Sequence, residues 1–148
     1  TVTGTLSSRL MSNYPAERQI SSPTVIRMSS GAGQDPVAMT CRTVGGADFG
    51  LALGVRDGFG LNTVGSLVRI SGRVTLVVGS YFYVDDGSDI QDILGRIGVM
   101  IRSFGTPSVK KGDIVGVTGI VQGNVPNGWA TNRRYMRIRQ ASDLSVWQ

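Results

Sequence analysis

The sequence predicts an all-β protein built around one small five-stranded Greek-key barrel, and three observations support this. Runs of residues in the second half alternate apolar and polar side chains with period two, as half-buried strands do. Gly and Asp-Gly turn signals separate these runs. Only two of the fifteen basic residues are lysine and only one of the ten acidic residues is glutamate, so the chain lacks the Glu/Lys-rich faces of surface helices.

Five segments are expected to supply the barrel strands. The first contains Gly72, and a glycine inside a strand often marks a bulge or the sharp bend of a small barrel. The second runs into Asp85-Asp86-Gly87-Ser88, whose residue types tolerate a tight reversal. In chain order the predicted strands are 67–78, 81–84, 98–103, 113–121 and 134–146.

Alternation along these strands also predicts which side chains fill the barrel interior. Most of them are valines, which suit a pleated and buried surface. The predicted interior residues are Val74, Phe82, Val84, Val99, Val115, Val117 and Ile138.

The same strands carry a recognisable string of motifs. Gly72-Arg73-Val74, Tyr81 to Ser88, Gly98-Val99 and Gly112 to Gly119 together give G-x-V … FYxDDGS … GV … GDxVxVTG. This string resembles the small OB modules of large secreted bacterial proteins and covers a little over half of the chain. The resemblance implies an OB-fold barrel over residues 65–148 but identifies no ligand.

One feature of many OB-folds is absent from this sequence. They place a helix between the third and fourth strands, whereas only residues 104–111 are available here, so the cap of the barrel must come from elsewhere. Residues 90–97 are expected to form a short helical turn between the second and third strands.

The first 28 residues repeat part of this barrel. Residues 1–6 (TVTGTL) repeat the pattern of residues 116–121 (GVTGIV), and in each copy a polar stretch and then a basic strand follow, at 18–28 and at 134–146. Chance is the alternative explanation, because VTG is common in β proteins. If the repeat is real, residues 1–28 are a partial OB-like strand pair that lacks the first three strands of its unit.

A long Gly/Ser-rich connecting arm, residues 29–64, separates the two parts. Flexible linkers lack large apolar side chains, so the apolar residues of the arm predict that part of it packs on a surface, either on its own barrel or on a neighbour. These residues are Leu51, Leu53, Val55, Phe59 and Leu61.

Residues suited to catalysis or metal binding are few. There is no histidine, which excludes His-dependent triads, and the single Cys41 excludes an intrachain disulfide and a Cys-based zinc site. The acidic cluster Asp85, Asp86, Asp89 and Asp92 could hold Ca²⁺ or could simply shape a turn, and its spacing does not match an EF-hand. We therefore expect no enzyme activity, no cofactor and no metal.

Two interpretations of the function remain open. The net charge of +5 and the aromatic residues of the second strand would suit an OB-fold binding module for single-stranded nucleic acid or a polysaccharide. The candidate ligand-binding residues are Tyr81, Tyr83, Arg69, Arg73 and Arg102. Against this, tyrosines can simply cover a barrel face, and the neighbouring Asp85-Asp86 would repel phosphates.

The favoured interpretation is an extracellular or cell-surface structural subunit without enzyme activity. An orphan strand pair exposes unpaired backbone groups and an apolar face, which copies of the chain can cover by strand addition to form a homo-oligomer, filament or fibre. The candidate assembly residues are Val2, Thr3, Leu6, Ile20, Val25 and Ile26. No apolar run is long enough to span a membrane.

Overall fold

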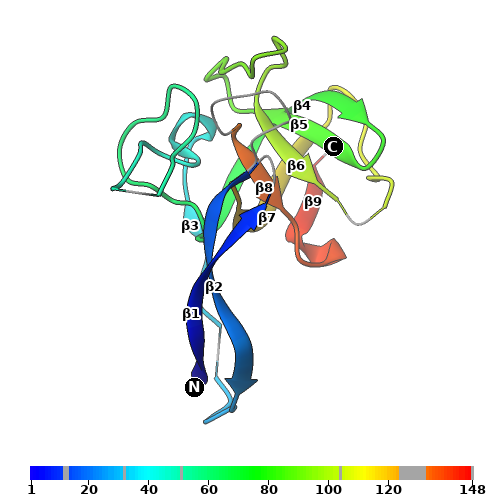
Figure 1. The fold of residues 1–148 in the computed structure, drawn as a ribbon. Coiled ribbons are helices and arrows are strands. Elements are labelled where there is room, and N and C mark those ends of the chain that lie inside the picture. Colours follow the sequence, from blue (N-terminus) through cyan, green and yellow to red (C-terminus); the bar gives the residue numbers. More distant parts are fainter. Residues whose placement is uncertain (12–13, 32, 51, 104, 124–132, 148) are drawn as a thin grey trace.

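The computed structural model describes residues 1–11, 14–31, 33–50, 52–103, 105–123 and 133–147, with only the backbone described for 8–11 and 14–18. These residues form two β-sheets and two short 3₁₀ helices (Figure 1). The first sheet consists of β1 (Val2–Met11) and β2 (Tyr14–Val25). The strands of the second are β3 (Val37–Ala38), β4 (Leu67–Val78), β5 (Tyr81–Asp85), β6 (Val99–Arg102), β7 (Ile114–Val121), β8 (Tyr135–Arg137) and β9 (Leu144–Trp147).

Five strands of the second sheet close into a barrel. Their order is β4-β5-β6-β8-β7, and pairing of β7 with β4 closes the ring. The β6–β8 pair is parallel, and the other four pairs are antiparallel. This is the strand order of an OB-type Greek-key barrel, so the predicted all-β fold class is confirmed.

The strand β4 is long because it serves two neighbours. Its first half pairs with β7 and its second half with β5, so it must bend between them. The bulge lies between Val74 and Leu76 and not at Gly72, whereas the alternative expectation, a bend near this glycine, agrees with the change of partner strand at Arg73. Gly72 instead pairs with Val115, and a Cβ atom there would overlap the Asp85 carbonyl group, so glycine is needed for a close approach of β5.

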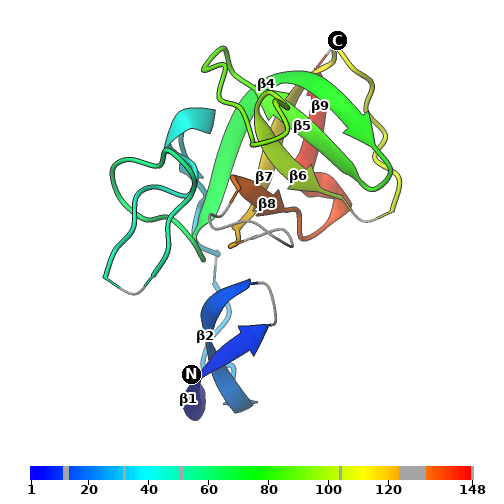
Figure 2. The same cartoon turned by 45° about the horizontal axis from the view of Figure 1, so that its top comes forward.

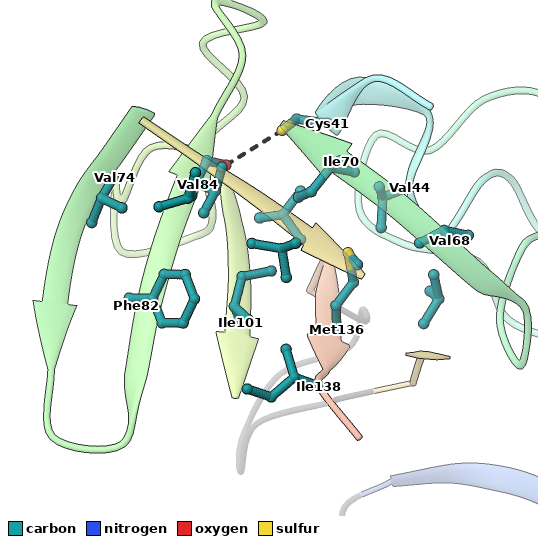
Figure 3. Packing of buried hydrophobic residues seen from close by; sticks show 14 of the residues in the cluster. Cys41, Val44, Val68, Ile70, Val74, Phe82, Val84, Ile101, Met136 and Ile138 are labelled. Carbon is teal, nitrogen blue, oxygen red and sulfur yellow. Dashed lines mark hydrogen bonds between the residues drawn. The ribbon is translucent and has the colours of Figure 1, made fainter. Parts of the chain in front are cut away.

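All seven side chains that alternation placed inside the barrel are buried. Phe82 and the five valines are 0% exposed, and Ile138 is 3% exposed. They form one cluster with Ile70, Ile101 and Met136 (Figure 3). The register deduced from the sequence is therefore correct, since a shift by one residue would have exchanged the two faces.

The arm supplies the additional core residues that the sequence could not place. The 3₁₀ helix η1 (Cys41–Thr43) brings Cys41 and Val44 into the barrel core, and both are fully buried. Of the apolar residues singled out in the arm, Val55 is buried, whereas Leu53, Phe59 and Leu61 are exposed and Leu51 lies outside the described residues.

A buried arginine fastens this arm to the barrel. Arg134 precedes β8, and its guanidinium group donates hydrogen bonds to the backbone carbonyls of Arg56 (2.9 Å), Asp57 (3.1 Å) and Arg42 (3.4 Å). Among the hydrogen bonds described, the buried guanidinium group donates only to backbone carbonyls of the arm. The arm and the barrel therefore fold against each other. The sequence carried no signal for this contact, because Arg134 is one of several arginines near predicted strands.

Two local expectations were wrong. Residues 90–97 form turns with an isolated bridge between Gln91 and Ile97 instead of a helical turn. The closing strand predicted at 134–146 is divided into β8, the 3₁₀ helix η2 (Ala141–Asp143) and β9. The division occurs where the Asp143 carboxylate accepts hydrogen bonds from the backbone N–H groups of Arg139 and Gln140, which turns the chain from β8 toward β9.

Candidate functional site

The two N-terminal strands form an amphipathic hairpin. Val2 pairs with Val25 and Leu6 with Ile20. Val2 and Leu6 lie on one face of β1 by alternation, and the residues paired with them lie on the same face because the irregularity between Thr3 and Thr5 adds one residue to β2. We call these four side chains the apolar face of the hairpin.

The opposite face of the hairpin is polar. Thr3 pairs with Thr24, and Thr5 with Ser21. The hydroxyl groups of Ser7 and Ser21 lie 2.5 Å apart in a hydrogen bond on this face. The polar face is therefore suited to water, in contrast to the face that carries valine, leucine and isoleucine.

No part of the described chain buries the apolar face. Val2 is 51% exposed, Leu6 66%, Ile20 44% and Val25 70%. In two views the hairpin extends away from the barrel (Figures 1 and 2). Ile26, the remaining candidate assembly residue, is also exposed, and its backbone exchanges hydrogen bonds with Thr1 at the open end of the hairpin.

The hairpin and the barrel share a structural detail at their common VTG motif. A Cβ atom at Gly4 would meet the Ile20 side chain and lie 2.8 Å from the Ser21 carbonyl oxygen, and one at Gly119 would lie 2.7 Å from the Arg137 carbonyl oxygen. In both copies the lack of a side chain at glycine allows the backbone of the next strand, β2 in the hairpin and β8 in the barrel, to lie close by. This agreement supports a real repeat, in which β1 corresponds to β7.

The candidate ligand-binding residues fall into two groups. Tyr81, Tyr83 and Arg102 lie together on β5 and β6, whereas Arg69 and Arg73 lie on the half of β4 that pairs with β7. The guanidinium of Arg73 donates a hydrogen bond to the Gly112 carbonyl. The structure therefore does not gather the five residues into one groove.

The tyrosines are engaged within the molecule. Tyr83 is 1% exposed, and its hydroxyl donates a hydrogen bond to Asp92 and accepts one from Arg96. Burial raises the pKa of Tyr83, so the hydroxyl is neutral at physiological pH. Tyr81 is half-buried under Arg102, whose guanidinium lies 5.4 Å from the ring centre. Of these two tyrosines, only Tyr81 retains ring surface on which a base or sugar could stack.

The acidic cluster shapes a turn. Asp85 accepts hydrogen bonds from the backbone of Gly87 and Asp89, and Asp92 accepts from Leu94 and Arg96. In the described part of the chain no group of three or more potential metal ligands is found. The carboxylates of Asp85 and Asp92 thus have backbone partners within the turn, and the described acidic side chains do not converge on a common ion site.

The neighbouring Asp86 links this turn to the arm. Its carboxylate accepts hydrogen bonds from the backbone N–H of Cys41 (2.8 Å) and from the Ser88 side chain (2.5 Å). Partial burial raises the pKa of Asp86, but these hydrogen bonds outweigh it and hold the pKa below its usual value. The charged carboxylate thus helps to position Cys41.

Cys41 has the character of a structural cysteine. Its thiol is buried and lies 3.4 Å from the Val84 carbonyl oxygen, to which it donates a hydrogen bond (Figure 3). Burial, reinforced by the charge of Asp86, raises the pKa of the thiol to about 12. A thiol that is neutral and inaccessible at physiological pH is a poor nucleophile.

Comparison with known proteins identifies no relative: no family model matches the chain, and neither the curated proteins nor the solved structures give a significant match. None of the helices described has both the length and the apolar character needed to cross a bilayer.

Proposed function

We propose that the protein is a non-enzymatic structural subunit that self-assembles into filaments or fibres through β-strand contacts of its N-terminal hairpin. The single observation that carries the proposal is the exposed apolar face of that hairpin, formed by Val2, Leu6, Ile20 and Val25. A two-stranded hairpin alone is at best marginally stable in water.

A partner on the apolar face would supply the missing stabilisation. Complete burial of one such side chain is worth about 1.5–3 kcal/mol, and these four are on average a little over half exposed. Covering them would contribute roughly 3.5–7 kcal/mol before the cost of association is subtracted. Because association itself costs several kcal/mol, burial of this face would act together with backbone hydrogen bonds between strands to hold two copies together.

The location proposed for this subunit is extracellular or at the cell surface. The support is the resemblance of the barrel motifs to OB modules of large secreted bacterial proteins.

The test compares matched charge insertions on the two faces of the hairpin. Leu6→Glu places a charge on the apolar face, and Thr24→Glu places the same charge on the polar face. We expect polymers in negative-stain micrographs of the wild type and Thr24→Glu, and dispersed particles of the 15.7 kDa chain for Leu6→Glu. A wild-type protein that remains monomeric at high concentration would contradict the proposal.

The second candidate function is an OB-fold module that binds single-stranded nucleic acid or a polysaccharide. The observation that favours it is Tyr81 with Arg102 above its ring, because aromatic and guanidinium groups stack on bases and sugars. Its test is binding of a single strand across a salt series, which should weaken by about 0.7 log units per phosphate contact for each tenfold rise in salt. Loss of binding in Tyr81→Ala would support this function.

A further inference from the structure

We propose that β1 of one copy pairs with β9 of the next copy, so that the contact joins two different sheet edges of the same chain. This inference rests on the proposed self-assembly and identifies its acceptor. It follows from a comparison of the strand edges, because a free edge that carries no protection is a template for pairing with another chain.

Three of the free edges in the described chain carry protective features. The strand β2 contains Pro15 and Pro23, which lack the N–H group needed for pairing. The strand β3 has only two residues and follows Pro36. The second half of β4 is irregular between Val74 and Leu76, and such bulges turn an edge away from a partner.

The outer edges of β1 and β9 carry neither a proline nor an extra residue, because both irregularities of the β1–β2 ladder, between Thr3 and Thr5 and between Arg9 and Met11, place the extra residue on β2. The strand β1 has no proline, and Arg9 is its only charged residue. The strand β9 ends the seven-stranded sheet, pairs on one side with β7, and has neither proline nor charge in Leu144–Trp147. Each copy therefore presents two unprotected edges, one on the hairpin and one on the barrel.

The strand β9 already pairs antiparallel with one strand of its own chain. The strand β7 pairs antiparallel with β9, with Val117 opposite Leu144 and Val115 opposite Val146. The outer edge of β9 and the free edge of β1 can pair antiparallel in the same manner, with β2 on the far side of β1. The resulting order in the joined sheet is β7-β9-β1-β2.

Exposed apolar side chains lie along the acceptor edge. Val146 is 42% exposed, Trp147 45% and the paired Ile114 37%. Val146 lies opposite the buried Val115, so it belongs to the inner side of the sheet. In the repeat, Val2 corresponds to the buried Val117, which places the apolar face of the hairpin on this same side.

The contact joins unlike surfaces, and this determines the form of the assembly. A copy that donates β1 to one neighbour still offers β9 to another. Such head-to-tail contacts extend into a filament unless the rotation between copies closes a ring. The inference thus explains why a polymer, and not a two-fold dimer, is expected.

Cysteine cross-linking tests the pairing directly. Directly opposed residues of antiparallel strands have Cα atoms about 4.5–5.5 Å apart, within the range that a disulfide can bridge. Thr3→Cys and Thr5→Cys provide two positions on the polar side of β1, and Ser145→Cys lies on the corresponding side of β9. The native Cys41 is buried and contributes little background.

The decisive sample is a mixture of two single variants under mild oxidation. We expect a disulfide-linked dimer when Ser145→Cys is mixed with Thr3→Cys or Thr5→Cys, and a ladder of multimers when both cysteines are in one chain. Thr24→Cys on β2 is the matched control, and it should give no product with Ser145→Cys.

The other outcomes separate this inference from the proposal on which it rests. Dimers of Thr3→Cys or Thr5→Cys alone would show that β1 pairs with β1 and would overturn the β1–β9 contact. Polymers without any cross-link in either mixture would overturn the contact while self-assembly stands. Absence of polymers in the wild type would overturn both.

Discussion

The strands β1 and β7 carry the same VTG motif but lie in opposite environments. In β7 the side chains of Val117 and Val121 are fully buried in the barrel, whereas the corresponding Val2 and Leu6 of β1 are more than half exposed. In both strands a glycine allows the backbone of the neighbouring strand to lie unusually close. The difference shows that the motif specifies a strand with one apolar face, and that the surrounding strands decide whether this face is covered.

The largest expected difference between the two regions is the cost of losing a large apolar side chain. Phe82→Ala removes a fully buried ring and should lower the free energy of unfolding by about 3–5 kcal/mol. Leu6→Ala removes a side chain that is 66% exposed and should change it by less than about 0.5 kcal/mol in the monomer. Urea unfolding, at a protein concentration too low for assembly, measures the free energy of unfolding of both variants. Similar losses in the two variants would show that the hairpin folds as part of the barrel core.

The second expected difference is sensitivity to acid. Asp143 accepts hydrogen bonds from the Arg139 guanidinium and from the backbone at the turn into β9, and Asp143→Asn should cost about 1–3 kcal/mol. The hydrogen bond from Arg139 lowers the pKa of Asp143 in the folded state. The charged carboxylate therefore contributes fully to the free energy of unfolding above the unfolded pKa of about 4, and this contribution disappears as the pH falls through the lower folded pKa.

Melting temperatures across a pH series measure this effect. The wild type and Asp143→Asn should converge once the pH falls below the folded pKa of Asp143, because the native carboxyl is then protonated as well. Asp57→Asn is the control, since its ion pair with Arg56 is exposed and should contribute little. A constant gap between wild type and Asp143→Asn at all pH values would contradict the role given to this carboxylate.

A third comparison uses the two equivalent glycines. Gly119→Ala forces a methyl group against the Arg137 carbonyl and should destabilise the barrel by about 1–3 kcal/mol. Gly4→Ala produces the same conflict with β2 but should leave the unfolding midpoint of the barrel unchanged and reduce polymer formation instead. If Gly4→Ala lowered the barrel midpoint as much as Gly119→Ala, the two parts would not be energetically separate.

The smallest effect concerns the thiol of Cys41, which reports on opening of the barrel. Because burial raises its pKa to about 12, alkylation at pH 8 should be slow in the native protein and fast in urea. The free energy of unfolding should also fall as the pH rises from about 9 toward 12. In this range the thiol ionises in the unfolded chain but stays protonated in the folded protein. Phe82→Ala should accelerate native labelling, whereas Leu6→Glu should not. Rapid labelling of the native wild type would show that the arm opens independently of the barrel.

The sequence by itself determined the barrel strands and their faces. Period-two alternation placed β4 at residues 67–78 and identified seven interior side chains, all of which are buried. It succeeded because pleating is a local property, so a strand with one apolar face has only one register that buries it. The strand pair at the N-terminus was predicted from a different signal, the match of residues 1–6 with residues 116–121.

Only the tertiary structure decided which surfaces are covered and where strands stop. Tyr83 was expected on an outer ligand-binding face, yet it is buried beside Met100 and Tyr135, since neighbouring strands and Arg96 cover it. The hydrogen bonds of Asp143 break the predicted closing strand and create β9, and residues 90–97 turn around Asp92 without a helix. Side-chain alternation carries no information about such partners, because they are brought together only when distant segments meet.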